Sequence, residues 1–126
     1  MALFRRDIGR RGEQAAAVFL RRRGLRIVEK NYHCGFGEID LICADGKTIV
    51  FVEVKTLSAN VHADPEEHVT PSKRMRIERA ARMWLQSLGN PRLLCRFDVV
   101  SVVMPKVGEP TIRHIIDAFP PSRWCR

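Results

Sequence analysis

The stretch that decides the fold is GEIDLICADGKTIVFVEVKTL, residues 37–57. Apolar residues recur at alternate positions from Glu38 to Ala44 and again from Thr48 to Thr56, a pattern typical of two β-strands. The dipeptide Asp45-Gly46 between them is a strong signal for a tight turn. The stretch therefore predicts a β-hairpin, and this hairpin carries four charged side chains in otherwise apolar strands: Glu38, Asp40, Glu53 and Lys55.

A two-residue loop of Asp45 and Gly46 would place Glu38 opposite Glu53 and Asp40 opposite Phe51. Directly paired residues share a face of a sheet, and so do residues two apart. All four charged side chains should therefore project from one face, with Asp40 and Glu53 as diagonal neighbours roughly 7–8 Å apart. Another even loop length would shift the pairing and keep the shared face.

Carboxylates crowded on a half-buried face repel one another, so either some are protonated or a cation lies among them. Asp and Glu oxygens without a nearby His or Cys cluster suit a hard ion such as Mg²⁺ or Mn²⁺. Lys55 would then lie within reach of whatever the metal holds and could orient a water or stabilise charge on a phosphate. The alternative is a hairpin at the edge of a sheet, with Glu53 and Lys55 facing solvent.

The rest of the chain predicts an α/β fold in one domain, residues 1–126. A helix is expected over 9–23 with Gly24 just past its end, and a second helix begins with Thr70 as N-cap and Pro71 at its first position. The expected order is helix, three strands, helix, two strands, which gives a mixed sheet with helices packed on it. The ranges expected for the other elements are strands 25–34, 93–104 and 111–118, and a second helix ending near 88.

A carboxylate also occurs in the first predicted helix, where Glu13 shares a stripe with Ala16, Ala17 and Leu20. This stripe should face the sheet, so Glu13 either finds a partner there or joins a metal site. The alternative is an ordinary acidic residue near a helix N-terminus, where the helix dipole favours it.

The net charge is +8 and is unevenly distributed. Residues 1–30 hold 9 basic and 3 acidic residues and residues 73–82 hold 5 and 1, whereas residues 31–72 hold 2 and 7. Basic flanks around an acidic middle suit a protein that binds phosphates with its flanks and cations with its middle. Solvated helix faces are the alternative. The best candidates for phosphate contacts are Arg10, Arg11, Lys73, Arg74 and Arg76.

Other classes of protein are less consistent with the sequence. It has no Gly-rich phosphate-binding loop of NTPases, no recognisable zinc signature and no apolar run long enough to span a membrane. The four cysteines show no CxxC pair, and we interpret them as reduced thiols in a cytoplasmic protein. We expect no membrane partner, and the oligomeric state is open, with a homodimer as one option.

Taken together, five segments resemble the YraN family of small bacterial proteins: Gly12-Glu13, GEIDLI (37–42), FVEVKT (51–56), Lys73 and RFDVV (96–100). The resemblance covers about residues 9–119. The family is similar to the PD-(D/E)xK, restriction-endonuclease-like nucleases, and especially to Holliday junction resolvases. That likeness implies an αβββαβ core with a mixed central sheet flanked by helices.

The resemblance also implies roles for individual residues. Asp40 and Glu53 would be metal ligands together with the backbone carbonyl of Val54, and Glu13 would match the helix-borne acid of the superfamily. Lys55 would be the catalytic lysine, and Lys73 a phosphate contact. His33, Cys43 and Leu57 depart from residues that are frequent in the family, in regions that concern substrate preference.

The sequence thus predicts a Mg²⁺- or Mn²⁺-dependent endonuclease acting on DNA, with branched or structured DNA as a substrate. The alternative is a nucleic-acid-binding module that does not cut and serves a recombination or repair partner. RNA is a third option that no residue excludes.

Overall fold

The structure is a computed structural model that describes residues 2–35, 37–59, 69–89 and 93–120, with side chains from residue 7 onward. Residues 60–68 and Cys125 lie outside the described residues. The elements follow in the order α1 (Ala2–Arg22), β1 (Arg26–Cys34), β2 (Gly37–Asp45), β3 (Thr48–Ser58), α2 (Pro71–Ser87), β4 (Cys95–Met104) and β5 (Thr111–Phe119). This order confirms the predicted α/β class with an αβββαβ core, although α1 begins earlier than the sequence indicated.

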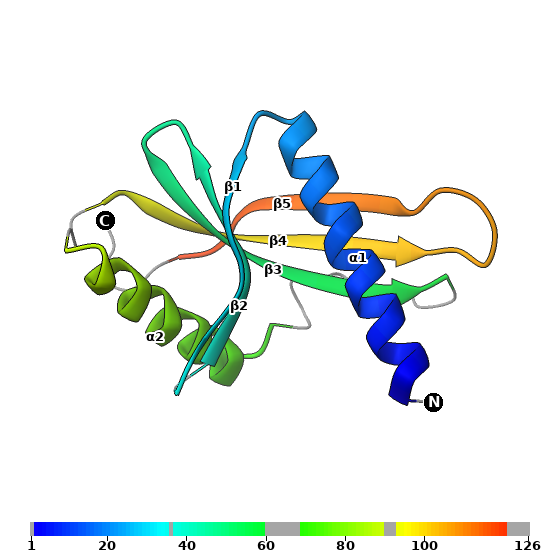
Figure 1. The fold of residues 1–126 in the computed structure, drawn as a ribbon, viewed down its shortest axis with the longest axis horizontal. Coiled ribbons are helices and arrows are strands. Elements are labelled where there is room, and N and C mark those ends of the chain that lie inside the picture. Colours follow the sequence, from blue (N-terminus) through cyan, green and yellow to red (C-terminus); the bar gives the residue numbers. More distant parts are fainter. Residues whose placement is uncertain (1, 36, 60–68, 90–92, 121–126) are drawn as a thin grey trace.

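The five strands form one mixed sheet in the order β1-β2-β3-β4-β5. Neighbours are antiparallel except β3 and β4, which run parallel because α2 connects them. β3 therefore lies in the middle of the sheet, and the alternative of a hairpin at the sheet edge is wrong. In Figure 1 the β1–β2 hairpin crosses β3, β4 and β5 steeply, and the two helices lie over different parts of the sheet.

Each helix covers its own apolar cluster. Ala16, Ala17 and Leu20 of α1 pack on side chains of β2, β3 and β4 that include Val52 and Val54. On the other face, α2 packs Ile77, Ala80, Ala81, Trp84 and Leu85 against a cluster that includes Ile39, Ile42, Phe51, Phe97 and Val99. Burying both faces explains why the odd and even positions of β3 are both apolar up to Glu53.

The hairpin register differs from the predicted one. Asp45 pairs with Thr48, so the two loop residues are Gly46 and Lys47, and Ile42 pairs with Phe51. Gly46 has φ +58, a left-handed conformation that glycine adopts without strain at the first position of such a turn. The predicted pairing of Glu38 with Glu53 is therefore wrong: Glu38 pairs with His33 on β1. The shift is by two residues, so the predicted shared face is preserved.

The second helix begins as predicted. Thr70 is the N-cap, its side-chain oxygen accepts a hydrogen bond from the Lys73 backbone N–H at 3.2 Å, and Pro71 occupies the first position. This capped start fixes the backbone of Lys73, whose side chain extends from α2 toward β3.

Asp98 of β4 is fully buried and joins the last two strands. Its carboxylate accepts hydrogen bonds from Arg96 Nε at 3.0 Å and from the Asp117 backbone N–H at 2.9 Å, and it lies 2.7 Å from His114 Nε2. Arg96 also pairs with the exposed Asp45 at 3.0 Å. Asp98 is thus a structural partner of both Arg96 and His114.

The cysteines depart in part from expectation. Cys34 and Cys43 are free thiols, whereas Cys95 is disulfide-bonded. The interpretation of all four as reduced thiols is therefore wrong for Cys95, because spacing along the sequence does not show which residues the fold brings to the start of β4. No helix in the described ranges is long and apolar enough to cross a membrane.

Candidate functional site

The site begins where β2 and β3 separate. Their ladder ends at the pair Leu41–Val52, one residue short of Asp40 and Glu53. Beyond this point β2 continues to pair with β1 alone, and the carboxylate of Asp40 accepts a hydrogen bond from the Val54 N–H at 2.8 Å. The Asp40 side chain thus accepts the hydrogen bond of the Val54 N–H at the point where β2 and β3 no longer pair through their backbones.

Glu53 lies inside this fork with only 7% of its surface exposed. A side-chain hydrogen bond links it to Asp40, so the two carboxyl groups are in direct contact, as their shared face predicted. Its counter-ion is the Lys73 ammonium at the start of α2, which forms an ion pair with Glu53 Oε1. Two strands and a helix therefore converge on one acidic pair.

This crowding changes the protonation of Asp40. Burial and the negative charge of Glu53 raise the pKa of Asp40 to about 8, although the hydrogen bond from Val54 favours the charged form. In the absence of another cation, Asp40 therefore keeps its proton at neutral pH and donates it to Glu53. The pair holds one negative charge instead of two.

In metal-free buffer, wild-type protein should lose stability relative to Asp40→Asn as the pH rises from about 4 to about 8. Over this window the folded protein holds a proton on Asp40 that the unfolded chain has released, so higher pH favours unfolding. The difference in unfolding free energy should change by at most about 1.4 kcal/mol per pH unit. Denaturant titrations of both proteins with a chelator present would measure it, and parallel pH profiles would contradict it.

Glu13 of α1 approaches the same site. Burial raises its pKa, a hydrogen bond from the Asn31 side chain opposes this effect, and the charges of Glu38 and Glu53 add to the increase. Asn31 lies in β1 with φ +52, a left-handed conformation that few residues other than glycine and asparagine adopt. The two residues border a cavity of about 440 Å³ together with Gly9 and Arg10.

Gly12 allows α1 to lie close enough for Glu13 to reach the site. A Cβ atom at Gly12 would lie 2.0 Å from Oγ1 of Thr56 in β3. Gly37 has a similar role at the other helix, because its Cβ would lie 2.5 Å from the backbone oxygen of Arg76 in α2. The glycine that precedes each of Glu13 and Glu38 is therefore a point of close approach between a helix and a strand.

Gly12→Ala should lower the free energy of unfolding by about 1–3 kcal/mol, because the added methyl forces α1 away from β3. Gly9→Ala is the matched control: its Cβ meets nothing within 4 Å, so better helix propensity should stabilise the protein by up to about 1 kcal/mol. Denaturant unfolding of both variants measures the two effects. Equal effects of the same sign would rule out the close contact as the cause.

Lys55 follows Glu53 on β3 at a half-buried position and pairs with Ser101 of β4. Since Val52 and Val54 belong to the cluster under α1, Glu53 and Lys55 project from the opposite face. The ammonium that pairs with Glu53 is that of Lys73, however. The catalytic role of Lys55 and metal ligation by the Val54 carbonyl stay predictions.

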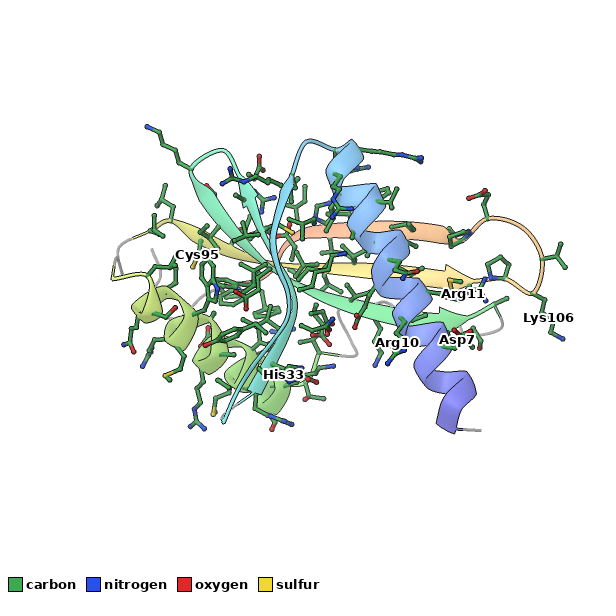
Figure 2. All side chains as sticks on the ribbon, viewed as in Figure 1. Asp7, Arg10, Arg11, His33, Cys95 and Lys106 are labelled. Carbon is green, nitrogen blue, oxygen red and sulfur yellow. The ribbon has the colours of Figure 1, made fainter. Side chains whose placement is uncertain are left out.

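The predicted phosphate-binding residues fall into separate environments. Arg10 lines the cavity beside Glu13, whereas Arg11 lines a larger groove between α1 and the β4–β5 turn. Figure 2 shows both on the N-terminal half of α1, with His33 near the start of α2. Arg76 is exposed, but Arg74 is partly engaged, with its Nε donating to the Val69 carbonyl oxygen and its guanidinium over the Phe119 ring.

The acidic pair fits a hard divalent cation in its donor chemistry. It offers only oxygen ligands, Glu53 is buried and Asp40 half-buried, and the negative charge of Glu53 raises the pKa of Asp40, an effect that a cation between them would relieve. Across the described part of the chain, no three acidic, histidine or cysteine side chains gather closely enough to hold a metal. The residues present match an ion that binds one or two carboxylates and keeps several waters, as Mg²⁺ does.

Sequence reasoning missed two contributors to this site. Lys73 was expected to contact phosphate, and its ion pair with Glu53 depends on a tertiary contact between α2 and β3. Asn31 was not singled out, although asparagine inside a predicted strand is unusual enough to indicate a left-handed residue.

The chain is similar to known proteins over most of its length. A model described as "Uncharacterised protein family UPF0102" matches residues 12–102, a range that includes Glu13, Asp40, Glu53, Lys55 and Lys73. A UPF0102 protein of Nocardia farcinica is 46% identical over 112 residues, which cover 89% of this chain and 88% of the relative. UPF0102 proteins of Geobacter sulfurreducens and Moorella thermoacetica are similar, at 42% identity over 112 residues (89% of this chain, 88% of the relative) and 47% over 102 (81% and 85%).

Proposed function

The chain belongs to the UPF0102 family, which is the YraN family, and on that premise we propose that it is a divalent-metal-dependent endonuclease acting on branched or otherwise structured DNA. The single observation that carries this proposal is the contact between the buried carboxyl group of Glu53 and the half-buried carboxyl group of Asp40 at the fork of β2 and β3. A protein that only bound nucleic acid would gain nothing from carboxylates beside a phosphate-binding surface.

Charge around the site supports a polyanionic substrate. Lys73 and Arg76 of α2 line a cavity together with Glu53, and Arg10 of α1 lines the cavity beside Glu13. A net charge of +8 adds a general attraction for phosphates that depends on salt and not on base sequence. The resemblance to PD-(D/E)xK nucleases of the junction-resolving kind supports structured DNA as the substrate class.

In the proposed mechanism, Asp40, Glu53 and the Val54 carbonyl would hold a Mg²⁺ or Mn²⁺ ion, which would supply a Lewis acid for the scissile phosphate. Lys55 orients the attacking water and stabilises the charge that develops on the phosphate. Glu13, held by Asn31, adds negative charge on the side of the site that α1 borders.

The test is a cleavage assay on linear, flap and four-way-junction DNA with Mg²⁺, Mn²⁺ or chelator. Glu53→Gln is the matched variant, because it keeps the size of the side chain and removes its charge. We expect the wild type to cut structured DNA only with metal. Because loss of residues that merely orient a ligand costs about 10–100-fold, loss of this ligand should cost at least about a hundredfold.

The rival is a non-catalytic nucleic-acid-binding module. It is favoured if the wild type binds the same DNAs and cuts none of them with either metal. Cleavage by Glu53→Gln at the wild-type rate would instead refute the assigned site.

A further inference from the structure

The ion pair between Lys73 and Glu53 carries an inference that rests on the proposed function and extends it to the order of ligand binding. The Glu53 side chain is only 8% exposed, whereas the Lys73 side chain is 40% exposed. A buried carboxylate without a partner is costly, so the protein without metal needs this ammonium. Lys73 is thus the resident cation of the acidic pair.

The ammonium of Lys73 is the cation that the structure places on Glu53. A divalent cation bound at Asp40 and Glu53 would place two positive charges beside that ammonium. Like charges at such short range repel strongly in a site with little water. The ammonium and the divalent ion therefore compete for Glu53.

Lys73 has a route out of the site. Its backbone is held by the Thr70 cap, but its side chain is a flexible four-carbon stem that can swing without moving α2. A cavity of about 390 Å³ opens beside the ion pair and is also lined by Ser72 and Arg76. An ammonium displaced into this cavity would join the exposed guanidinium of Arg76. Glu38 also lines the cavity, and its carboxylate lies 3.2 Å from His33 Nδ1, so the two cations of α2 would outnumber this acidic group and favour an anionic group of the substrate.

We infer that Lys73 is an exchangeable counter-ion. Its ammonium pairs with Glu53 until a divalent cation binds, and it is then released toward the DNA phosphates. Metal binding and DNA binding are coupled through this one side chain. The metal-free protein keeps its acidic pair neutralised, and only the metal-loaded protein presents Lys73 to DNA.

The test is titration of Mn²⁺ alone into the full chain, followed by calorimetry. Lys73→Met keeps the apolar stem and removes the competing charge, so it should bind Mn²⁺ about tenfold tighter than the wild type. Lys73→Gln, which can still donate a hydrogen bond to Glu53, should also bind more tightly and serves if the methionine variant does not fold. Arg79→Met removes the same charge from an exposed position of α2 and should leave the Mn²⁺ affinity close to that of the wild type.

A second readout concerns DNA. Anisotropy of a labelled four-way junction should show that Mn²⁺ strengthens DNA binding more in the wild type than in Lys73→Met. Mn²⁺ affinity that is unchanged or weaker in both Lys73 variants would overturn the exchange and leave the proposed function standing. Absence of Mn²⁺ binding in every protein would overturn both.

Discussion

Lys55→Met is expected to lower metal-dependent DNA cleavage by roughly 10²–10⁴-fold, the usual contribution of a positioned acid-base group. The residue is half-buried on the central strand, two positions after the buried Glu53 and on the same face. It is neither a proposed metal ligand nor the ammonium that neutralises Glu53, which is Lys73. Its loss should therefore affect turnover and leave both Mn²⁺ affinity and DNA affinity close to those of the wild type.

The measurement is single-turnover cleavage of the preferred DNA, with DNA affinity followed by anisotropy on the same samples. Lys47→Met is the control, because Lys47 is an exposed lysine in the turn of the same hairpin and lies away from the acidic pair. If Lys55→Met cuts as fast as the wild type, the role assigned to Lys55 is wrong. If it instead loses DNA affinity in proportion to rate, Lys55 is a binding residue.

Asp98→Ala is expected to lower the free energy of unfolding by about 3–5 kcal/mol, the range for breaking a buried charge pair from one side. The fully buried carboxylate has partners on both of the last two strands. Its removal takes the buried partner from the Arg96 guanidinium, which keeps only the exposed Asp45, and from the His114 ring, whose side chain is only 1% exposed. Fluorescence-monitored denaturation in the presence of chelator would measure this loss.

Asp45→Ala is the matched control, since Asp45 pairs with the same guanidinium from a side chain that is 48% exposed. An exposed ion pair contributes only about 0–1 kcal/mol, so the two losses should differ several-fold. Similar losses in both variants would show that burial of Asp98 does not set its contribution.

The pH dependence of this cluster has the opposite sign to that of Asp40. Burial would raise the pKa of Asp98, but hydrogen bonds from His114 and Arg96 outweigh it and hold the pKa below its usual range. The stabilisation is therefore present above the usual aspartate range and disappears as the pH falls through the lowered value. Acid therefore weakens the fold through Asp98, whereas alkaline pH weakens the metal-free fold through Asp40.

Local patterns in the sequence were sufficient for most of the fold. Alternation around a glycine turn predicted the β2–β3 hairpin, and Thr70-Pro71 predicted the capped start of α2. The shared face of Asp40 and Glu53 also followed, because a register error of two residues does not change which side of a strand faces which way. These features depend on residues close together in the chain, which is why the sequence alone determined them.

The tertiary structure decided which of these side chains are buried and which of them come together in one site. Whether Glu53 lies at an edge or in the core depends on the parallel pairing of β3 with β4 across the α2 connection. The ion pair with Lys73, the support of Glu13 by Asn31 and the burial of Asp98 with His114 each join segments far apart in the chain. Such contacts have no local signature, because they arise only when packing brings helices and strands together and removes the water between them.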